Sequence, residues 1–289
     1  MTEKVLGIDI GNSALKAVLV SHSLRAGFKV EMAEVIAIAG SGGVAEALAS
    51  LGEKVDYRQV RINLSLPADA VSFHNVKLPF RDDKKIRQTI AFELETMLPQ
   101  GMDNYLIDYN IISQFQHSDQ RSHYSEMLAA VVPRAVVQGK LALFGENPPE
   151  ISVIGIATLA VASLLTARRA LTGSALLLDV GAGQMVAVFL KQDKILQVRR
   201  YNFGAALSAG KKGETDHSPL AAGQPDGKGR EGEAAREACR RFCQELANTL
   251  EFLKWGGSME DGLDRIILTG GGALQRDLQE ELARFFSLP

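Results

Sequence analysis

The sequence predicts an α/β protein built from two related domains, with a small α+β subdomain inserted in the first. The main observation is a repeat: the stretch "LGIDIGNSALKAV" at 6–18 returns as "LLLDVGAGQMVAV" at 176–188, displaced by 170 residues. Leu, Asp, Gly, Ala and Val recur in register between the two copies. The second observation is that further strand-like segments follow each copy before a helix-like one. We therefore expect one structural unit to occur twice.

The first unit begins with three strand-like segments that we expect to form an antiparallel meander. An apolar run at 5–11 and its partner at 15–22 read as a hairpin, and the alternating segment 28–38 reads as a third strand. A short helix is expected at 41–52, with the serine that opens it as a candidate cap. The segment 59–67 is expected to be a further strand.

The segment from Asp69 to Pro133 (69–133) has a different order of strand-like and helix-like runs, and we expect it to form the inserted subdomain. A strand-like run precedes an amphipathic helix, and two more strand-like runs follow, the second leading into a helix. An acid, Asp82 or Asp83, lies at the N-terminal end of the amphipathic helix, where it is stabilising. The apolar stripe of this helix comprises Ile86, Ile90, Leu94 and Met97. The alternative is that the segment simply continues the first domain.

We place the first domain at 1–168 and the second at 169–289. The second domain restarts with three strand-like segments between 175 and 203. The stretch 208–232 follows, with six glycines, two prolines and many charges, and we expect a flexible insertion there.

The rest of the second domain is predicted to be helix, strand and helix. A long helix-like segment runs from about Glu233 to Trp255, and a strand then leads into a triple glycine at 270–272. A final helix is expected at 274–287. A domain of this kind should continue with one more strand, so we expect the C-terminus to be truncated.

Composition and charge favour a globular protein and exclude several functions. The 289 residues are 46% hydrophobic, and their formal net charge is −2. The basic residues form no stripe with interleaved aromatics, so we expect no nucleic-acid partner. Cys239 and Cys243 lie four residues apart on a helix-like segment, where a disulfide is geometrically poor. We expect structural thiols in a reducing compartment.

The sequence shows neither a signal peptide nor an uninterrupted apolar run long enough to span a membrane. The longest candidate, 151–171, contains Ser, Gly and Thr and ends in arginines. We interpret it as a loop followed by a core helix.

Each repeat places an acid at the end of a strand, directly before a turn of small residues. Asp9 and Asp179 are these acids, and such turns expose backbone N–H groups that a phosphate can approach without side-chain clash. The carboxylates would face the metal that accompanies a polyphosphate, and Lys16 adds a cation beside the first turn. The glycines 270–272 leave a flat surface for an adenine or ribose. One such turn is an ordinary feature, whereas the three sites together indicate a nucleotide clamp.

We therefore predict a site for ATP and Mg²⁺ between the two hairpins. Neither a Walker A loop nor a dinucleotide-binding fingerprint occurs between a strand and a helix. The predicted metal-facing residues are Asp9 and Asp179. The predicted nucleotide contacts are Gly11, Asn12, Ser13, Lys16, Gly181, Ala182, Gly183, Gln184, Gly270, Gly271 and Gly272.

These three sites resemble the phosphate 1, phosphate 2 and adenosine motifs of the actin, heat-shock chaperone and sugar-kinase (ASKHA) superfamily. The resemblance implies an actin-like fold of two RNase-H-like domains, with nucleotide in the cleft between them. It also implies that the internal repeat is the duplication of that superfamily.

A narrower resemblance covers nearly the whole chain. The segment "LPFRDDKKIRQTIAFELETMLPQGMDNYLIDYNII" (78–112) is similar to one in PilM-type proteins of type IV pili, and "FCQELANTLEFLKW" (242–255) resembles the helix before their last glycine motif. The cytoplasmic part of GspL in type II secretion shares this fold. The resemblance implies a cytoplasmic scaffold, peripheral to or anchored at the bacterial inner membrane. Such a scaffold binds the cytoplasmic tail of a bitopic PilN-like or GspM-like protein and relays to a motor ATPase; homodimer formation is left open.

The sequence departs from the PilM pattern in the segment 151–165. Gly155, Ala157 and Thr158 stand where acids are expected, and acids there help to orient a hydrolytic water and a metal. The second phosphate loop also lacks its usual hydroxyl residues. We therefore expect ATP binding with weak or absent hydrolysis.

Other functions stay open at the level of sequence. One is an active ATPase or kinase of the sugar or acetate kinase type, but the first half offers no Asp in a polar loop as a general base. Another is a filament-forming cell-division protein near the FtsA group, whose members end in an amphipathic helix. The choice between a pilus and a secretion system is open as well.

Overall fold

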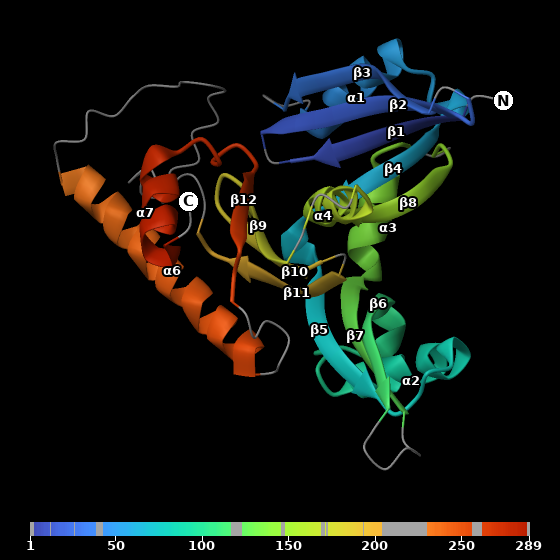
Figure 1. The fold of residues 1–289 in the computed structure, drawn as a ribbon. Coiled ribbons are helices and arrows are strands. Elements are labelled where there is room, and N and C mark those ends of the chain that lie inside the picture. Colours follow the sequence, from blue (N-terminus) through green and yellow to red (C-terminus); the bar gives the residue numbers. More distant parts are fainter. Residues whose placement is uncertain are drawn as a thin grey trace.

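In the computed structural model, the described residues form three β-sheets with helices packed on their faces (Figure 1). Residues up to 156 supply a five-stranded and a three-stranded sheet, and residues from 174 onward supply a four-stranded sheet. The structure describes residues 3–11, 13–25, 27–38, 43–116, 123–145, 148–168, 171, 173–192, 194–203, 230–255 and 262–287.

The five-stranded sheet contains the first copy of the repeat. Its elements are β1 (Glu3–Ile10), β2 (Ala14–Ser23), β3 (Gly27–Ala37), α1 (Gly43–Lys54), β4 (Arg61–Leu66) and β8 (Ile151–Ile156). The strand order is β3-β2-β1-β4-β8. The first three strands are antiparallel neighbours, whereas β4 runs parallel to both β1 and β8. The expected meander is therefore present, and α1 packs against its β2 and β3.

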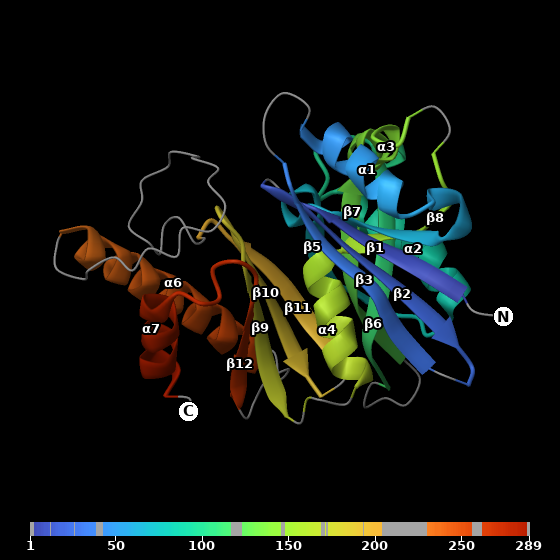
Figure 2. The ribbon, with the colours of Figure 1, turned by 90° about the horizontal axis from the view of Figure 1, so that it is seen from above.

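The four-stranded sheet contains the second copy and follows the same plan. Its elements are β9 (Ser174–Val180), β10 (Met185–Lys191), β11 (Lys194–Tyr201), α6 (Arg230–Trp255), β12 (Arg265–Thr269) and α7 (Arg276–Phe286). The order β11-β10-β9-β12 matches β3-β2-β1-β4, with β12 again parallel to the first strand of the unit. The helices α6 and α7 cover one face of this sheet, and α4 (Ala157–Ala167) lies on the other (Figure 2).

The three-stranded sheet lies within the segment expected to form an inserted subdomain. Its strands are β5 (Ser72–Leu78), β6 (Tyr105–Gln116) and β7 (His123–Pro133), in the order β5-β7-β6. The helix α2 (Asp83–Glu95) buries Ile86, Ile90 and Leu94 against this sheet. The helix α3 (Arg134–Ala142) continues directly from β7, and short 3₁₀ turns lie at Tyr57–Gln59, Ala68–Ala70 and Met102–Asn104.

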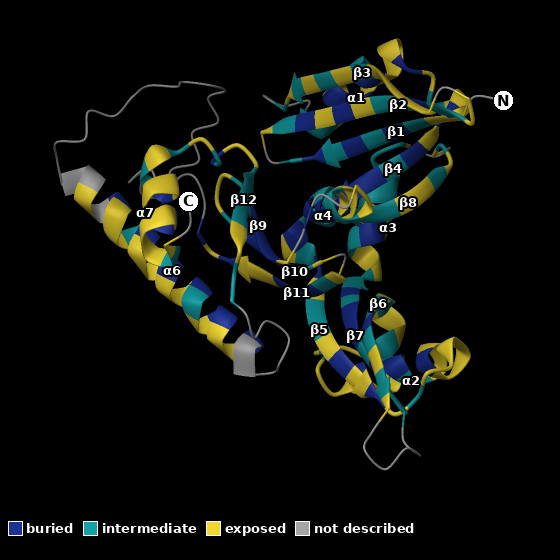
Figure 3. Cartoon of the chain, in the orientation of Figure 1, coloured by how far each residue is buried: buried dark blue, intermediate teal, exposed yellow. Residues whose placement is uncertain are grey.

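Buried residues, dark blue in Figure 3, occur in all three sheets. They form three hydrophobic cores. One core joins β1, β2 and β4 to α1, and a second joins α2 to the three-stranded sheet. The largest core joins the four-stranded sheet, α6, α7 and α4 to the face of the three-stranded sheet that points away from α2. The side-chain amide of Asn75 on β5 also donates to the Leu196 carbonyl of β11, at 3.1 Å. The cores therefore do not follow the predicted domain boundary, which stays a prediction.

Two sequence predictions are wrong. Residues Ile151–Ile156 were expected to be a loop, but they form β8, because their backbone pairs in parallel with β4. Met97 was placed on the apolar stripe of α2, but its exposed fraction is 53% because the helix ends at Glu95. The helix N-terminus behaves as expected, since the Asp82 carboxylate accepts from the Lys85 N–H at 2.9 Å.

Some expectations fall outside the described residues. These are the Ser41 cap and most of the predicted flexible insertion. The helix expected from Glu233 begins at Arg230, so the last three residues of that insertion belong to α6. Cys239 and Cys243 are unpaired and fully buried, and burial raises the pKa of these thiols to about 11 and about 12. None of the described helices is long and apolar enough to cross a membrane.

Candidate functional site

The two hairpins close with the same backbone hydrogen bond, 170 residues apart. In the first, the Gly11 N–H donates to the Ala14 carbonyl at 3.0 Å, and in the second the Gly181 N–H donates to the Gln184 carbonyl at 3.0 Å. The registers agree as well, since Ile10 faces Leu15 and Val180 faces Met185. The hairpin tips lie near each other in both ribbon views (Figures 1 and 2). Equivalent sequence therefore produces equivalent backbone.

Asp9 is held by groups of its own sheet. Its carboxylate accepts a hydrogen bond from the Ser65 hydroxyl, which comes from the neighbouring strand β4. Its second oxygen lies 3.5 Å from the Lys16 ammonium, directly across the hairpin. The side chain of Asp9 remains 33% exposed and that of Lys16 58% exposed. Carboxylate and ammonium thus lie next to the turn of the first hairpin, where solvent and ligand can reach them.

A second lysine lies near this carboxylate. Burial lowers the pKa of Lys140 in α3, and the negative charges of Asp9 and Asp69 oppose that shift. The chain therefore brings two cations, Lys16 and Lys140, into the electrostatic field of Asp9. A cation that is partly desolvated interacts more strongly with an anion than one in bulk water.

Asp179 is held by groups from elsewhere in the chain. The Thr158 hydroxyl, in the first turn of α4, donates to one carboxylate oxygen at 2.6 Å, and Thr158 is only 2% exposed. The other oxygen lies against the backbone of Gly270, where an added Cβ would be 2.5 Å away. Val186 faces Asp179 across the hairpin, in the place that Lys16 has opposite Asp9. Both carboxylates are half-buried, and the second is contacted by α4 and by the glycine triplet. It has no lysine partner among the described residues.

The glycine triplet is attached to the second hairpin. Gly270 has φ of +85°, a conformation that L side chains rarely adopt, and an added Cβ there would also meet the Val180 carbonyl oxygen at 2.6 Å. The Gly272 N–H donates to the same carbonyl at 3.0 Å. Gly271 is exposed, and an added Cβ would meet nothing within 4 Å. The structure thus brings two of the predicted sites together and leaves Gly271 open to a ligand.

Not every predicted contact can be placed. Asn12 lies outside the described residues. The carbonyl of Ser13 accepts from the Ile38 N–H at 2.9 Å, which ties the first turn to the end of β3. Gly183 is exposed, and an added Cβ would again meet nothing within 4 Å.

Sequence reasoning missed Ser65, Thr158 and Lys140. The parallel pairing of β4 with β1 ends with Ile8 opposite Leu64, so Ser65 comes next, beside Asp9. A pairing of these two strands predicted from the sequence would have found Ser65. Thr158 and Lys140 reach the hairpins only through the packing of α4 and α3, and no local pattern marks them.

The described residues contain no cluster of three or more His, Cys, Asp or Glu side chains that could hold a metal ion. Two single carboxylates still suit Mg²⁺, which is usually bound by one or two carboxylates together with waters and substrate phosphates. The donor set therefore fits a magnesium ion that arrives with a polyphosphate.

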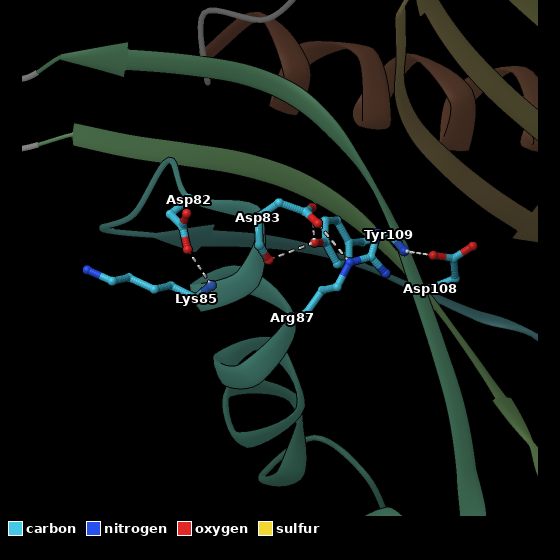
Figure 4. Close-up of polar contacts among 6 residues, drawn as sticks. All are labelled: Asp82, Asp83, Lys85, Arg87, Asp108 and Tyr109. Atoms are coloured by element: carbon cyan, nitrogen blue, oxygen red, sulfur yellow. Dashed lines mark hydrogen bonds and ion pairs between the residues drawn. The ribbon is translucent and has the colours of Figure 1, made fainter.

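A separate polar cluster lies on the inserted segment and fixes α2 to β6 (Figure 4). The Tyr109 hydroxyl donates to Asp83 at 2.6 Å, and the Arg87 guanidinium is 2.8 Å from the same carboxylate. These two contacts lower the pKa of Asp83, the Tyr109 bond being the larger cause. Desolvation, followed by the bond to Asp83, raises the pKa of Tyr109 to about 12. All three groups have partners within the cluster, so we assign it a structural role.

Two shallow cavities lie away from the hairpins. One, of about 160 Å³, runs between β12 and α7, and the other, of about 370 Å³, lies between β11 and α6. Neither is lined by a residue of the hairpin turns.

Known proteins resemble the chain in sequence and in fold. The family model described as "Type IV pilus assembly protein PilM" matches residues 7–288. A PilM-PilN type IV pilus biogenesis complex contains a chain with a TM-score of 0.76 and 22% identity, covering 98% of this chain and 86% of that one. A Bacteroides thetaiotaomicron protein with an actin-like ATPase fold and unknown function gives a TM-score of 0.53 at 10% identity, over 99% and 89%.

A third structure, the cytoplasmic domain of EpsL from the type II secretion system of Vibrio cholerae, gives a TM-score of 0.45 at 14% identity, over 71% and 74%. No curated protein sequence gives a significant match to the chain. The expected actin-like fold is confirmed by the first two structures.

Proposed function

Because the chain belongs to the PilM family of type IV pilus assembly proteins, we propose that it is a nucleotide-binding scaffold of a pilus assembly platform. The observation that carries the proposal is the pair of hairpins with identical turns, each with a carboxylate at the same position. Two such turns can grip a polyphosphate from both sides with backbone N–H groups.

The proposed ligand is ATP with Mg²⁺. The turns at Gly11 and Gly181 would receive the phosphates, and Lys16 would neutralise part of their charge. Asp9 and Asp179 would face the metal through water. Gly271, open on the glycine triplet, would contact the adenosine.

We propose that hydrolysis is weak or absent. The residues at the start of α4 include no acid that could orient a water, since Gly155 and Ala157 are apolar. The hydroxyl of Thr158 is engaged with Asp179. An active ATPase would require a base that these positions do not provide.

The proposed partner is the cytoplasmic tail of a PilN-like bitopic membrane protein, with relay to the motor ATPase. Support comes from the family and from the similarity to a chain in a PilM-PilN complex. On this proposal the protein lies at the cytoplasmic face of the inner membrane. Fluorescence anisotropy of a labelled peptide of the PilN-like tail from the same organism tests it. Saturable binding is expected, and no binding at any concentration would contradict the proposed partner.

Calorimetric titration with MgATP tests the nucleotide site. Lys16→Ala should raise the Kd at least about tenfold, because a charge-assisted hydrogen bond to phosphate is worth about 1.5–3 kcal/mol. Lys29→Ala is the matched control, since Lys29 is an exposed, ion-paired lysine on β3 of the same sheet. Equal affinity of wild type and Lys16→Ala would overturn the assignment of the first hairpin.

A second titration separates adenosine from phosphate contacts. Gly271→Asp should weaken binding of ATP more than binding of inorganic tripolyphosphate, because position 271 has room for a side chain that would occupy the adenosine surface. Equal ATP affinity in the variant and the wild type would count against that placement.

A further inference from the structure

The largest hydrophobic core unites parts of the chain that the sequence assigns to different domains. It contains Leu128 and Val137 of the inserted segment and Ala162 of α4, together with Phe189 of the second sheet. A separate core holds only the first sheet, α1 and their neighbours. Because a hydrophobic interface resists relative motion, the cores divide the chain into two bodies. The first-sheet body carries Asp9, and the larger body carries Asp179.

The chain passes between these bodies at the end of β4, at the end of α3 and at the end of β8. Leu64 belongs to the first-sheet core and Leu66 to the larger one. Val137 packs in the larger core, and Leu143 packs on the first. Ile151 packs on the first core, and Ile156 is part of the larger one. The third crossing is followed at once by α4, whose second residue is Thr158.

Thr158 makes the polar contact that joins α4 to the second hairpin. Its hydroxyl donates to Asp179 at 2.6 Å, and it is nearly fully buried. The residue before α4, Ile156, provides no side-chain cap. The Asp179 carboxylate, bonded by the second residue of α4, also lies where a helix N-terminus favours negative charge. In the first hairpin the equivalent carboxylate, Asp9, is bonded by Ser65 of its own sheet.

We propose that Thr158 is a positioning residue that fixes α4 to the Asp179 hairpin, so that α4, the inserted subdomain and the second sheet move as one body. The part that moves is the first sheet with α1. This inference rests on the proposed nucleotide site and adds that its two carboxylates belong to bodies that move relative to each other. Its first test needs no nucleotide.

Distances between spin labels, measured by double electron–electron resonance, test the division. Labels at Leu164 on α4 and Glu280 on α7 lie within the proposed larger body, and Glu53 on α1 lies in the other; all three residues are exposed. The native Cys239 and Cys243 are fully buried and should not react with the label. Without nucleotide, the 164–280 distance distribution should be narrow and the 53–280 distribution broad. Equal widths for the two pairs would overturn the division into bodies.

Variants test the role of the hydroxyl. Thr158→Val preserves the shape of the side chain and should broaden the 164–280 distribution, and Thr158→Ser should restore the wild-type width. Ser65→Ala is the matched control, because it removes the corresponding bond in the first hairpin and should leave the 164–280 pair unchanged. An unchanged distribution in Thr158→Val, or equal broadening in Ser65→Ala, would overturn the proposed role of Thr158.

A nucleotide arm separates this inference from the proposed function. MgATP should bind Thr158→Val about tenfold more weakly than wild type, because Asp179 loses the bond that orients it. Affinity equal to wild type would contradict the positioning of Asp179 for the ligand. If wild type binds no MgATP, the proposed function fails, while the distances still decide the division into bodies.

Discussion

The two hairpins share a backbone and differ in what surrounds their carboxylates. Asp9 has a hydroxyl partner on the adjacent strand, a lysine across the hairpin and access to solvent. Asp179 has a hydroxyl partner on α4, a valine across the hairpin and the glycine triplet against its side. The first site is therefore built within one sheet, whereas the second is assembled from distant segments of the chain; both carboxylates are half-buried.

This difference shows how a repeated hairpin can keep its backbone while its two copies acquire different surroundings. The turn is set by small residues at the same spacing, so it is retained in both copies. The neighbours of the second carboxylate are set by segments outside the repeat: α4, which precedes the second copy, and the glycine triplet, which follows it. The first hairpin offers a lysine to a ligand, and the second also connects parts of the protein.

The largest expected effect comes from the glycine triplet. Gly270→Ala should destabilise the protein by about 3 kcal/mol, because the new Cβ would clash with Asp179 and with the Val180 carbonyl at a positive φ. Urea unfolding followed by circular dichroism measures the change.

Gly271→Ala is the control for this substitution, since its Cβ would meet nothing within 4 Å. It should change the free energy of unfolding by less than about 0.5 kcal/mol. Similar free energies of unfolding for the two variants would show that Asp179 and Val180 do not pack against Gly270 as described.

A smaller effect should distinguish the two turns themselves. A Cβ at Gly181 would lie 2.9 Å from the Gln184 carbonyl oxygen, whereas one at Gly11 would lie 3.2 Å from the Ala14 carbonyl oxygen. Gly181→Ala should therefore cost about 1–2 kcal/mol of stability, and Gly11→Ala less than about 1 kcal/mol. Thermal or urea unfolding of both variants provides the comparison. A larger loss of stability in Gly11→Ala than in Gly181→Ala would contradict the prediction that the second turn is the more tightly packed.

The sequence was sufficient to predict the parts of the fold that depend on local patterns. The repeat at 6–18 and 176–188 identified both hairpins, and alternation or helical periodicity identified most other elements. The error at Ile151–Ile156 has a physical reason: a short apolar run without alternation is compatible with a buried parallel strand, a loop or part of a helix. Only pairing with β4 decides between them.

The side-chain environment of the site depends on packing, which the sequence does not display. Ser65 could be found once β4 was paired with β1, because strand register is a regular rule. Thr158 was noticed only for not being an acid, and its bond to Asp179 follows from where α4 lies against the second sheet. The close approach of Gly270 to Asp179 likewise requires two distant segments of the chain to meet in space.

The smallest expected effect is electrostatic and belongs to the first hairpin alone. The charge of Asp9 raises the pKa of Lys140 against the lowering caused by burial, and Asp179 is not among the groups that act on this lysine. Asp9→Asn should therefore lower the pKa of Lys140 further, because one opposing negative charge is removed. Asp179→Asn should leave that pKa unchanged. NMR titration of the lysine side chains in both variants measures the difference. Equal shifts would mean that the two carboxylates share one electrostatic site, and the contrast between a hairpin built within one sheet and one assembled from distant segments would then be lost.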